Sequence, residues 1–143
     1  MNSNTLLIPV VIQIGLTLAI YFRLVLAKAA AVKAGQVNEA RRALYDDAWP
    51  ESVLQLNNNI RNQFELPVLF YVLVFALIQI NAVGSIALLA AWVFALSRLA
   101  HAYVHTGVNI VKIRRNIFLV GAVSVLVMLL NLAAALVGSL LWA

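Results

Sequence analysis

Long apolar stretches without charge alternate with two charged windows along the chain. Residues 1–22, 66–97 and 116–143 contain no Asp, Glu, Lys or Arg, and they make up over half of the 143 residues. A membrane-spanning helix needs about 20 mostly apolar residues, and lipid offers no hydrogen-bond partner to an unpaired backbone, so these stretches predict membrane helices. We expect four spans, at about residues 6–26, 58–80, 83–105 and 117–141.

The segments between the spans predict how the helices are connected. Residues 81–84 form so short a link that the second and third helices should make an antiparallel hairpin. The first helix should project beyond the bilayer and end near Gly35. Nothing in the chain indicates an internal repeat or a second domain. We therefore predict an all-α fold, a transmembrane four-helix bundle, in a single domain that covers residues 1–143.

Two residues shape the second helix. It should begin before its span, near Ser52, whose hydroxyl is a candidate N-cap. Pro67 lacks the N–H that would donate to the carbonyl of Gln63, so we expect a kink at this point.

The charge distribution predicts the orientation of the bundle. Charged side chains make up 10% of the residues, whereas about 25% is usual in a soluble domain. Residues 23–65 hold six basic and five acidic side chains, and residues 98–115 hold four basic and no acidic ones. The positive-inside rule therefore places both windows in the cytoplasm and both termini outside. Because orientation explains the net charge of +5, nucleic acid is disfavoured as a partner.

The ends of the chain carry two further expectations. No Lys or Arg precedes the first apolar run, so we interpret it as a retained span rather than a cleaved signal peptide. Trp142 lies at the outer end of the fourth span, where it is either an aromatic anchor at the interface or an ordinary lipid-facing residue. The short turns and small size favour an integral protein of a bacterial inner membrane.

A polar stripe marks the second helix at its cytoplasmic end. At 100° per residue, four polar side chains fall within an arc of about 100°, namely Asn58, Arg61, Asn62 and Glu65. Ionisable groups at membrane depth are costly and normally face a partner or a wet cavity. Glu65 could pair with Arg61 or Arg98 for structural reasons alone, or such a pair could belong to a binding site.

A second polar stripe lies at the end of the third span. It comprises Arg98, His101, His105 and, if Gly107 does not break the helix, Asn109 and Lys112. The two histidines have the i, i+4 spacing of metal sites. Because the chain has no Cys and no third His, we expect no metal site.

Two such stripes at one end of a bundle suit a small anionic ligand. Arginine binds carboxylates through paired hydrogen bonds, an Asn amide both donates and accepts, and Glu65 can hold an ammonium group. A ligand with carboxylates and an α-amine, such as an amino acid or a short peptide, matches these side chains. The neighbouring apolar spans would meet a lipophilic second substrate that arrives from the bilayer.

Three segments together resemble the MAPEG family, the membrane-associated proteins in eicosanoid and glutathione metabolism, over essentially the whole chain. The first is Arg61–Pro67, whose Arg-Asn-x-x-Glu pattern resembles the start of the family's second helix. The others are Arg98–Thr106 and Val108–Phe118, which contains two adjacent arginines. The resemblance implies a homotrimer of four-helix bundles, with glutathione as co-substrate bound between neighbouring subunits near the cytoplasmic face.

The resemblance also implies roles for individual residues. Arg114 would be the catalytic residue, since its charge favours the thiolate of glutathione over the thiol. The implied glutathione-binding residues are Arg61, Asn62, Glu65, His101, His105, Lys28 and Arg115. His105 stands where eicosanoid-type members have a Tyr. Arg115 and Phe118 stand where some members have hydroxyl side chains, which weighs against eicosanoid isomerase chemistry.

We therefore expect a membrane-bound glutathione-dependent transferase or peroxidase that acts on lipophilic electrophiles or hydroperoxides. Its partners would be further copies of itself, the lipid bilayer and the lipophilic substrate. Two alternatives stay open, a catalytically silent protein with the MAPEG fold and a small four-span transporter. The transporter is the weaker of the two, because four-span exporters carry their membrane Glu well inside a span, whereas Glu65 lies near the mouth.

Overall fold

All regular secondary structure in the part of the chain that the structure describes is helical. The computed structural model describes residues 3–141, a range without strands. Its elements are the 3-10 helix η1 (Ser3–Leu6), α1 (Leu7–Lys33), the 3-10 helix η2 (Asp46–Ala48), α2 (Glu51–Gln63), α3 (Leu66–Gln79), α4 (Ser85–Thr106) and α5 (Val111–Leu141). Four stretches are long and apolar enough to cross a membrane, with α2 and α3 together forming one of them. This confirms the all-α class and the presence of four helical stretches able to span a membrane, while Trp142 lies outside the described residues.

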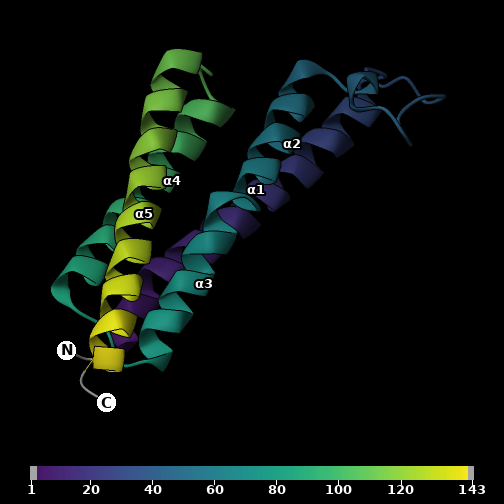
Figure 1. Ribbon diagram of the computed structural model, residues 1–143. Coiled ribbons are helices and arrows are strands. Elements are labelled where there is room, and N and C mark those ends of the chain that lie inside the picture. Colours follow the sequence, from purple (N-terminus) through teal and green to yellow (C-terminus); the bar gives the residue numbers. More distant parts are fainter. Residues whose placement is uncertain (1–2, 142–143) are drawn as a thin grey trace.

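The helices pass back and forth between two ends of the molecule that differ in composition. At one end lie η1, the turn between α3 and α4, and the end of α5, and we call it the uncharged end (Figure 1). At the other lie the end of α1, η2, the start of α2, the end of α4 and the start of α5, and we call it the charged end (Figure 1). The helices α4 and α5 run antiparallel beside each other (Figure 1).

Two apolar clusters hold the bundle together. The cluster nearer the uncharged end joins η1, α1, α3, α4 and α5 around Phe70 and Phe94, whose rings stack with centroids 4.4 Å apart. The second cluster joins α1, α2 and α4 and includes Ile20, Leu24 and Val53. Both clusters use one face of each helix, and large apolar side chains on the other faces stay exposed, as expected for helices surrounded by lipid.

The end of α1 follows from Gly35. The N–H of Gly35 donates to the carbonyl of Val32, and the N–H of Gln36 donates to that of Ala31, which is the Schellman pattern. This pattern needs a residue in the left-handed region after the helix, and Gly35 has φ 66°. The predicted helix end near Gly35 is therefore confirmed.

The start of α2 differs from the prediction. The helix begins at Glu51, and Pro50 occupies the N-cap position without a side-chain cap. The N–H groups of Val53 and Leu54 donate to the carbonyl of Pro50 instead. Ser52 thus lies inside the first turn, and its assignment as N-cap was wrong. The helix already starts after Pro50, whose ring fixes φ.

The second span is broken rather than kinked at Pro67. The helix α2 ends at Gln63 and α3 begins at Leu66, so Phe64 and Glu65 lie outside both helices. Glu65 has φ −97° and ψ −100°, values that belong to neither a helix nor a strand. The missing N–H of Pro67 explains why the turn around Gln63 does not continue. The break leaves the last carbonyl groups of α2 without helical donors.

The end of α4 settles the extent of the second polar stripe. The helix ends at Thr106, with Gly107 as its C-cap, and Asn109 has a positive φ of 49°. Asn109 is therefore not on the same helix as His101 and His105. The stripe consists of Arg98, His101 and His105, all three buried.

A chain of buried amides joins α1 to α2 just before the break. Nε2 of Gln13 donates to Oε1 of Gln63 at 2.7 Å, and Nε2 of Gln63 donates to Oδ1 of Asn59 at 2.9 Å. All three side chains are buried. The hydropathy pattern did not predict this contact, because it links residues 50 positions apart.

Candidate functional site

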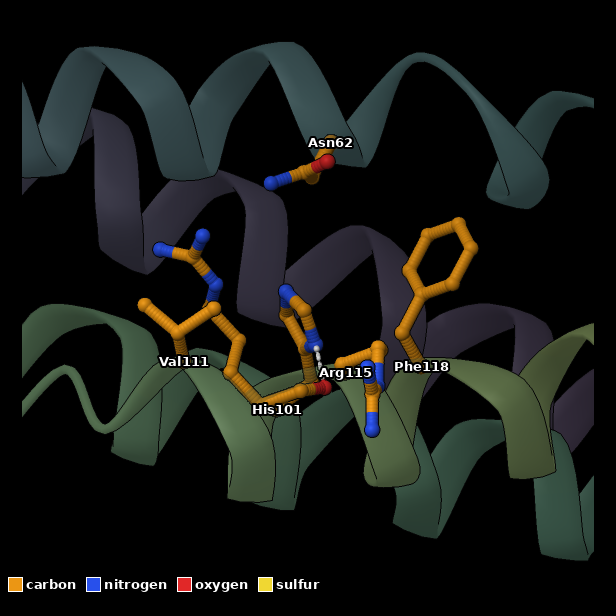
Figure 2. Close-up of a pocket in the computed structure, with 6 residues that line it drawn as sticks. Asn62, His101, Val111, Arg115 and Phe118 are labelled. Carbon is orange, nitrogen blue, oxygen red and sulfur yellow. Dashed lines mark hydrogen bonds between the residues drawn. The ribbon is translucent and has the colours of Figure 1, made fainter.

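A cavity of about 330 Å³ lies at the charged end, between α2 and the start of α5. Three different helices line it, with Asn62 from α2, His101 from α4, and Val111, Arg114, Arg115 and Phe118 from α5. Figure 2 shows Asn62 on one side of the cavity and the α5 residues on the other, with His101 between them. The lining contains two arginines and no acidic residue, so the cavity favours an anion.

Buried Arg98 connects this cavity to the break in the second span. Its side chain is 0% exposed, and Nη2 donates to the backbone carbonyl of Asn62 at 3.0 Å. That carbonyl belongs to the last turn of α2, where a cation also complements the helix dipole. The guanidinium carbon lies 5.8 Å from the ring centroid of Phe118. Arg98 therefore fixes the position of Asn62, whose side chain lines the cavity.

Arg98 was placed in the polar stripe by its spacing but was not among the predicted binding residues. Nε and Nη1 of Arg98 have no hydrogen-bond partner among residues 3–141. Glu65 and Arg98, which the sequence offered as a possible pair, form no ion pair within 4.0 Å in the described chain. The sequence signal that could have found Arg98 is its position one turn before His101 on the same helix face.

The two histidines pack against each other beside the cavity. Nδ1 of His101 lies 3.2 Å from the carbonyl oxygen of Arg114, as the dashed line in Figure 2 marks. Since a carbonyl only accepts, Nδ1 carries the proton, and Nε2 is left as a buried acceptor without a partner among the described residues. The His105 ring meets that of His101 edge-on at 5.4 Å, and its Nδ1 lies 3.3 Å from the side-chain nitrogen of Asn62.

Two arginines at the start of α5 supply the positive charge of the cavity. Arg114 and Arg115 both line it. Nη1 of Arg114 donates to Oδ1 of Asn109 at 2.6 Å, so the loop before α5 orients this side chain. No residue within 4.0 Å forms an ion pair with either arginine in the described part of the chain. Both guanidinium groups are thus available to an anionic ligand.

Three predicted binding residues lie away from this cavity, and a fourth, His105, lies beside it without lining it. Arg61 pairs with the carboxylate of Asp46 in η2. The Nζ atom of Lys28 lies 4.9 Å from the ring centroid of Trp49. Glu65 is exposed in the break between α2 and α3. Of the first polar stripe, only Asn62 lines the cavity.

The histidine pair has no further metal ligand beside it. Within residues 3–141, no group of three or more His, Cys, Asp or Glu side chains is arranged to hold a metal ion. Two imidazoles alone fall short of the three protein ligands of a catalytic zinc site.

Fold and site together define a four-span helical membrane protein with an arginine- and histidine-lined cavity near one membrane face. The MAPEG family model matches residues 6–134, which include all three segments that carried the resemblance. The chain therefore belongs to the MAPEG family, a family of membrane proteins of glutathione and eicosanoid metabolism. Searches of the curated proteins and of the solved structures found no match.

Proposed function

We propose that the protein is a membrane-bound glutathione-dependent transferase or peroxidase for lipophilic electrophiles or hydroperoxides. The observation that carries this proposal is the grouping of Asn62, His101, Arg114 and Arg115 around one cavity without an acidic side chain. Glutathione brings two carboxylates, an ammonium group and a thiol. The two arginines suit the carboxylates or the thiolate, and the amide of Asn62 suits its peptide groups.

Arg114 is the residue that we assign to the thiol. A free thiol has a pKa of about 8.5 and is mostly protonated at neutral pH, and a neighbouring guanidinium favours the thiolate. The chain contains no Cys, so the nucleophilic sulfur must come from the co-substrate. The unpartnered Nε2 of His101 is an acceptor beside the cavity and can receive a hydrogen bond from the ligand.

The reaction follows from a thiolate beside a lipophilic partner. The sulfur forms a bond to the electrophilic carbon, and the leaving group departs with its electron pair. With a hydroperoxide, the thiolate takes one oxygen and the alcohol is released, and a second glutathione then yields the disulfide and water. In both cases the bilayer delivers the second substrate, and Arg114 stabilises the anionic sulfur before attack.

A homotrimer belongs to the same proposal. Arg61, Glu65 and Lys28 do not line the cavity of their own subunit. A ligand bound between neighbouring subunits would reach such residues, with Glu65 near the amine of glutathione. The proposed orientation has both charged windows in the cytoplasm, where glutathione is made, and a bacterial inner membrane fits it.

Glutathione binding to the detergent-purified protein tests the proposal. We expect saturable binding in calorimetry and a thiolate absorbance when glutathione is bound. Arg114→Ala should abolish that absorbance and lower kcat/KM about 100-fold, the usual effect of removing one group that stabilises a developing anion. Lys33→Ala, which removes an equal charge outside the cavity, should change neither. Absence of saturable binding to the wild type would refute the proposal.

A catalytically silent family member is the second candidate, and Phe118 favours it. This ring lines the cavity, and no Ser, Thr or Tyr hydroxyl does so. A thiolate is therefore stabilised by guanidinium groups alone. Glutathione that binds without any thiolate absorbance in the wild type would identify the silent protein.

A further inference from the structure

A second cavity, of about 380 Å³, lies at the charged end and shares no lining residue with the first. Three helices meet around it. Its lining includes Arg23 and Leu26 of α1, Ser52, Gln55 and Leu56 of α2, and Thr106 of α4. Its lining mixes polar side chains, which we call the polar wall (Arg23, Ser52, Gln55 and Thr106), with apolar ones, which we call the apolar wall (Leu26, Ala27 and Leu56).

The helices place this cavity at the edge of the hydrocarbon layer. Arg23 is the first charged residue after 22 uncharged ones, α4 ends at Thr106, and α2 begins one residue before Ser52. At 1.5 Å per residue, the 22 residues of α4 span about 33 Å, close to the hydrocarbon thickness of about 30 Å. Three chain segments therefore agree that the cavity lies where acyl chains give way to headgroups.

The polar wall holds a guanidinium without a carboxylate. Nη1 of Arg23 donates to Oγ1 of Thr106 at 2.9 Å, and Thr106 in turn donates to the carbonyl of Ala102. The ion pairs in residues 3–141 involve Arg41, Arg42 and Arg61, and none includes Arg23. Arg23 therefore keeps N–H donors for an anion.

Two α2 side chains complete the polar wall. Nε2 of Gln55 donates to the carbonyls of His105 and Gly107, which fixes α2 against the end of α4. The exposed hydroxyl of Ser52 has no hydrogen bond to any other described residue. A neutral donor beside a fixed guanidinium is the arrangement that binds phosphate oxygens.

The apolar side chains around Arg23 indicate which kind of phosphate-containing molecule would fit the cavity. Phe22 and Leu26 flank Arg23 on the surface of α1 and are 66% and 54% exposed. An arginine that only extends its charged group toward the membrane surface needs neither a cavity nor polar side chains from two other helices around it. The apolar wall and the apolar rim match a molecule with acyl chains.

We propose that this cavity binds the phosphate of an anionic phospholipid headgroup. Arg23 donates hydrogen bonds to the phosphate oxygens, and the Ser52 hydroxyl donates one more. Leu26 and Leu56 contact the glycerol backbone and the first methylenes of the chains. The lipid bridges α1, α2 and α4 and stabilises the charged end. This site is distinct from the first cavity, because the two have no lining residue in common.

Lipid binding to the purified full-length protein in a neutral detergent tests the site. Phosphatidylglycerol, phosphatidylcholine and inorganic phosphate are each titrated while bound lipid is followed by native mass spectrometry and thermal stability by a melting curve. We expect phosphatidylglycerol to bind and raise the Tm more than phosphatidylcholine does. Equal binding of the two lipids would overturn the proposal. Full protection by inorganic phosphate at the same concentration would overturn the lipid assignment and leave an anion site.

Substitutions distinguish a specific phosphate-binding site from general electrostatic attraction to anionic lipid. Arg23→Ala should weaken phosphatidylglycerol binding about tenfold, as expected for losing charge-assisted hydrogen bonds. Arg23→Gln keeps an N–H donor for Thr106, so it should fold even if the alanine variant does not. It should lose as much affinity for phosphatidylglycerol as Arg23→Ala, because the positive charge is gone. Ser52→Ala should lose two- to threefold. Lys33→Ala removes an equal charge from α1 outside the cavity and should bind normally. Equal losses in Arg23→Gln and Lys33→Ala would refute the site.

Discussion

The two ends of the bundle differ in the kind of side chain that the helices bury there. At the uncharged end, η1, α3, α4 and α5 bury an apolar cluster around Phe70 and Phe94. At the charged end, the same α4 buries Arg98, His101 and His105, and polar atoms of the first two remain unpartnered among the described residues. Buried polar atoms without partners are costly. The difference indicates that the uncharged end provides stability and that the charged end is organised for a ligand.

The largest effect should come from the apolar cluster. Phe94→Ala removes a side chain that is 0% exposed and stacks on Phe70. Comparable losses in soluble cores cost about 3–5 kcal/mol. Because lipid tails are as apolar as the core, only the packing part is lost here, and we expect about 2–3 kcal/mol in a detergent unfolding titration. Leu89→Ala, at a site that is 67% exposed, is the control and should be nearly neutral.

The contact between α4 and α5 should show the next largest effect. A Cβ at Gly121 would meet Oγ of Ser97 at 3.0 Å and Cδ of Arg98 at 3.8 Å. The Ser97 hydroxyl donates to the carbonyl of Phe94, so it is not free to move. Gly121→Ala should therefore cost about 1–2 kcal/mol of unfolding free energy. Gly138→Ala meets nothing within 4 Å and should be neutral or slightly stabilising. Similar values for the two variants would contradict the close contact.

A substitution at Arg98 tests whether the charged end acts on the ligand. Arg98→Ala removes the hydrogen bond to the carbonyl of Asn62 and should reduce glutathione affinity about tenfold, or about 1.4 kcal/mol, by releasing that residue. Arg98→Lys keeps the charge and should recover part of the affinity. Calorimetry gives the affinity, and a melting curve of each variant separates misfolding from lost positioning. Unchanged affinity in a folded Arg98→Ala protein would show that the side chain has only a structural role.

The smallest effect concerns the start of α2. Ser52→Ala should change the unfolding free energy in lipid-free detergent by less than about 0.5 kcal/mol, since the hydroxyl caps nothing. A genuine N-cap would cost about 0.5–2 kcal/mol. A loss in that range would mean that the Ser52 hydroxyl does cap α2, in contradiction to the structure, in which Pro50 occupies the N-cap position.

Much of the charged end could be predicted from the residues alone. Asn62, His101, Arg114 and Arg115 were candidates from their spacing or from the family resemblance, and all four line one cavity. The break near Pro67 was expected as a kink, because a missing N–H is a local property. The partner of Arg61 was not predicted, since the loop carrying Asp46 has no periodicity from which its path could be inferred.

The sequence by itself determined the four apolar helices able to span a membrane, the end of α1 at Gly35 and the end of the bundle at which the charged residues gather. These features depend on hydrophobic run length and on the backbone chemistry of single residues, which act over a few positions. Only the tertiary structure decided that Arg98 holds Asn62, that Gln13 meets Gln63, and that Arg23 lies beside Thr106, in pairs 36, 50 and 83 positions apart. Such contacts depend on how the helices rotate and cross, and those angles arise from the packing of all the helices at once.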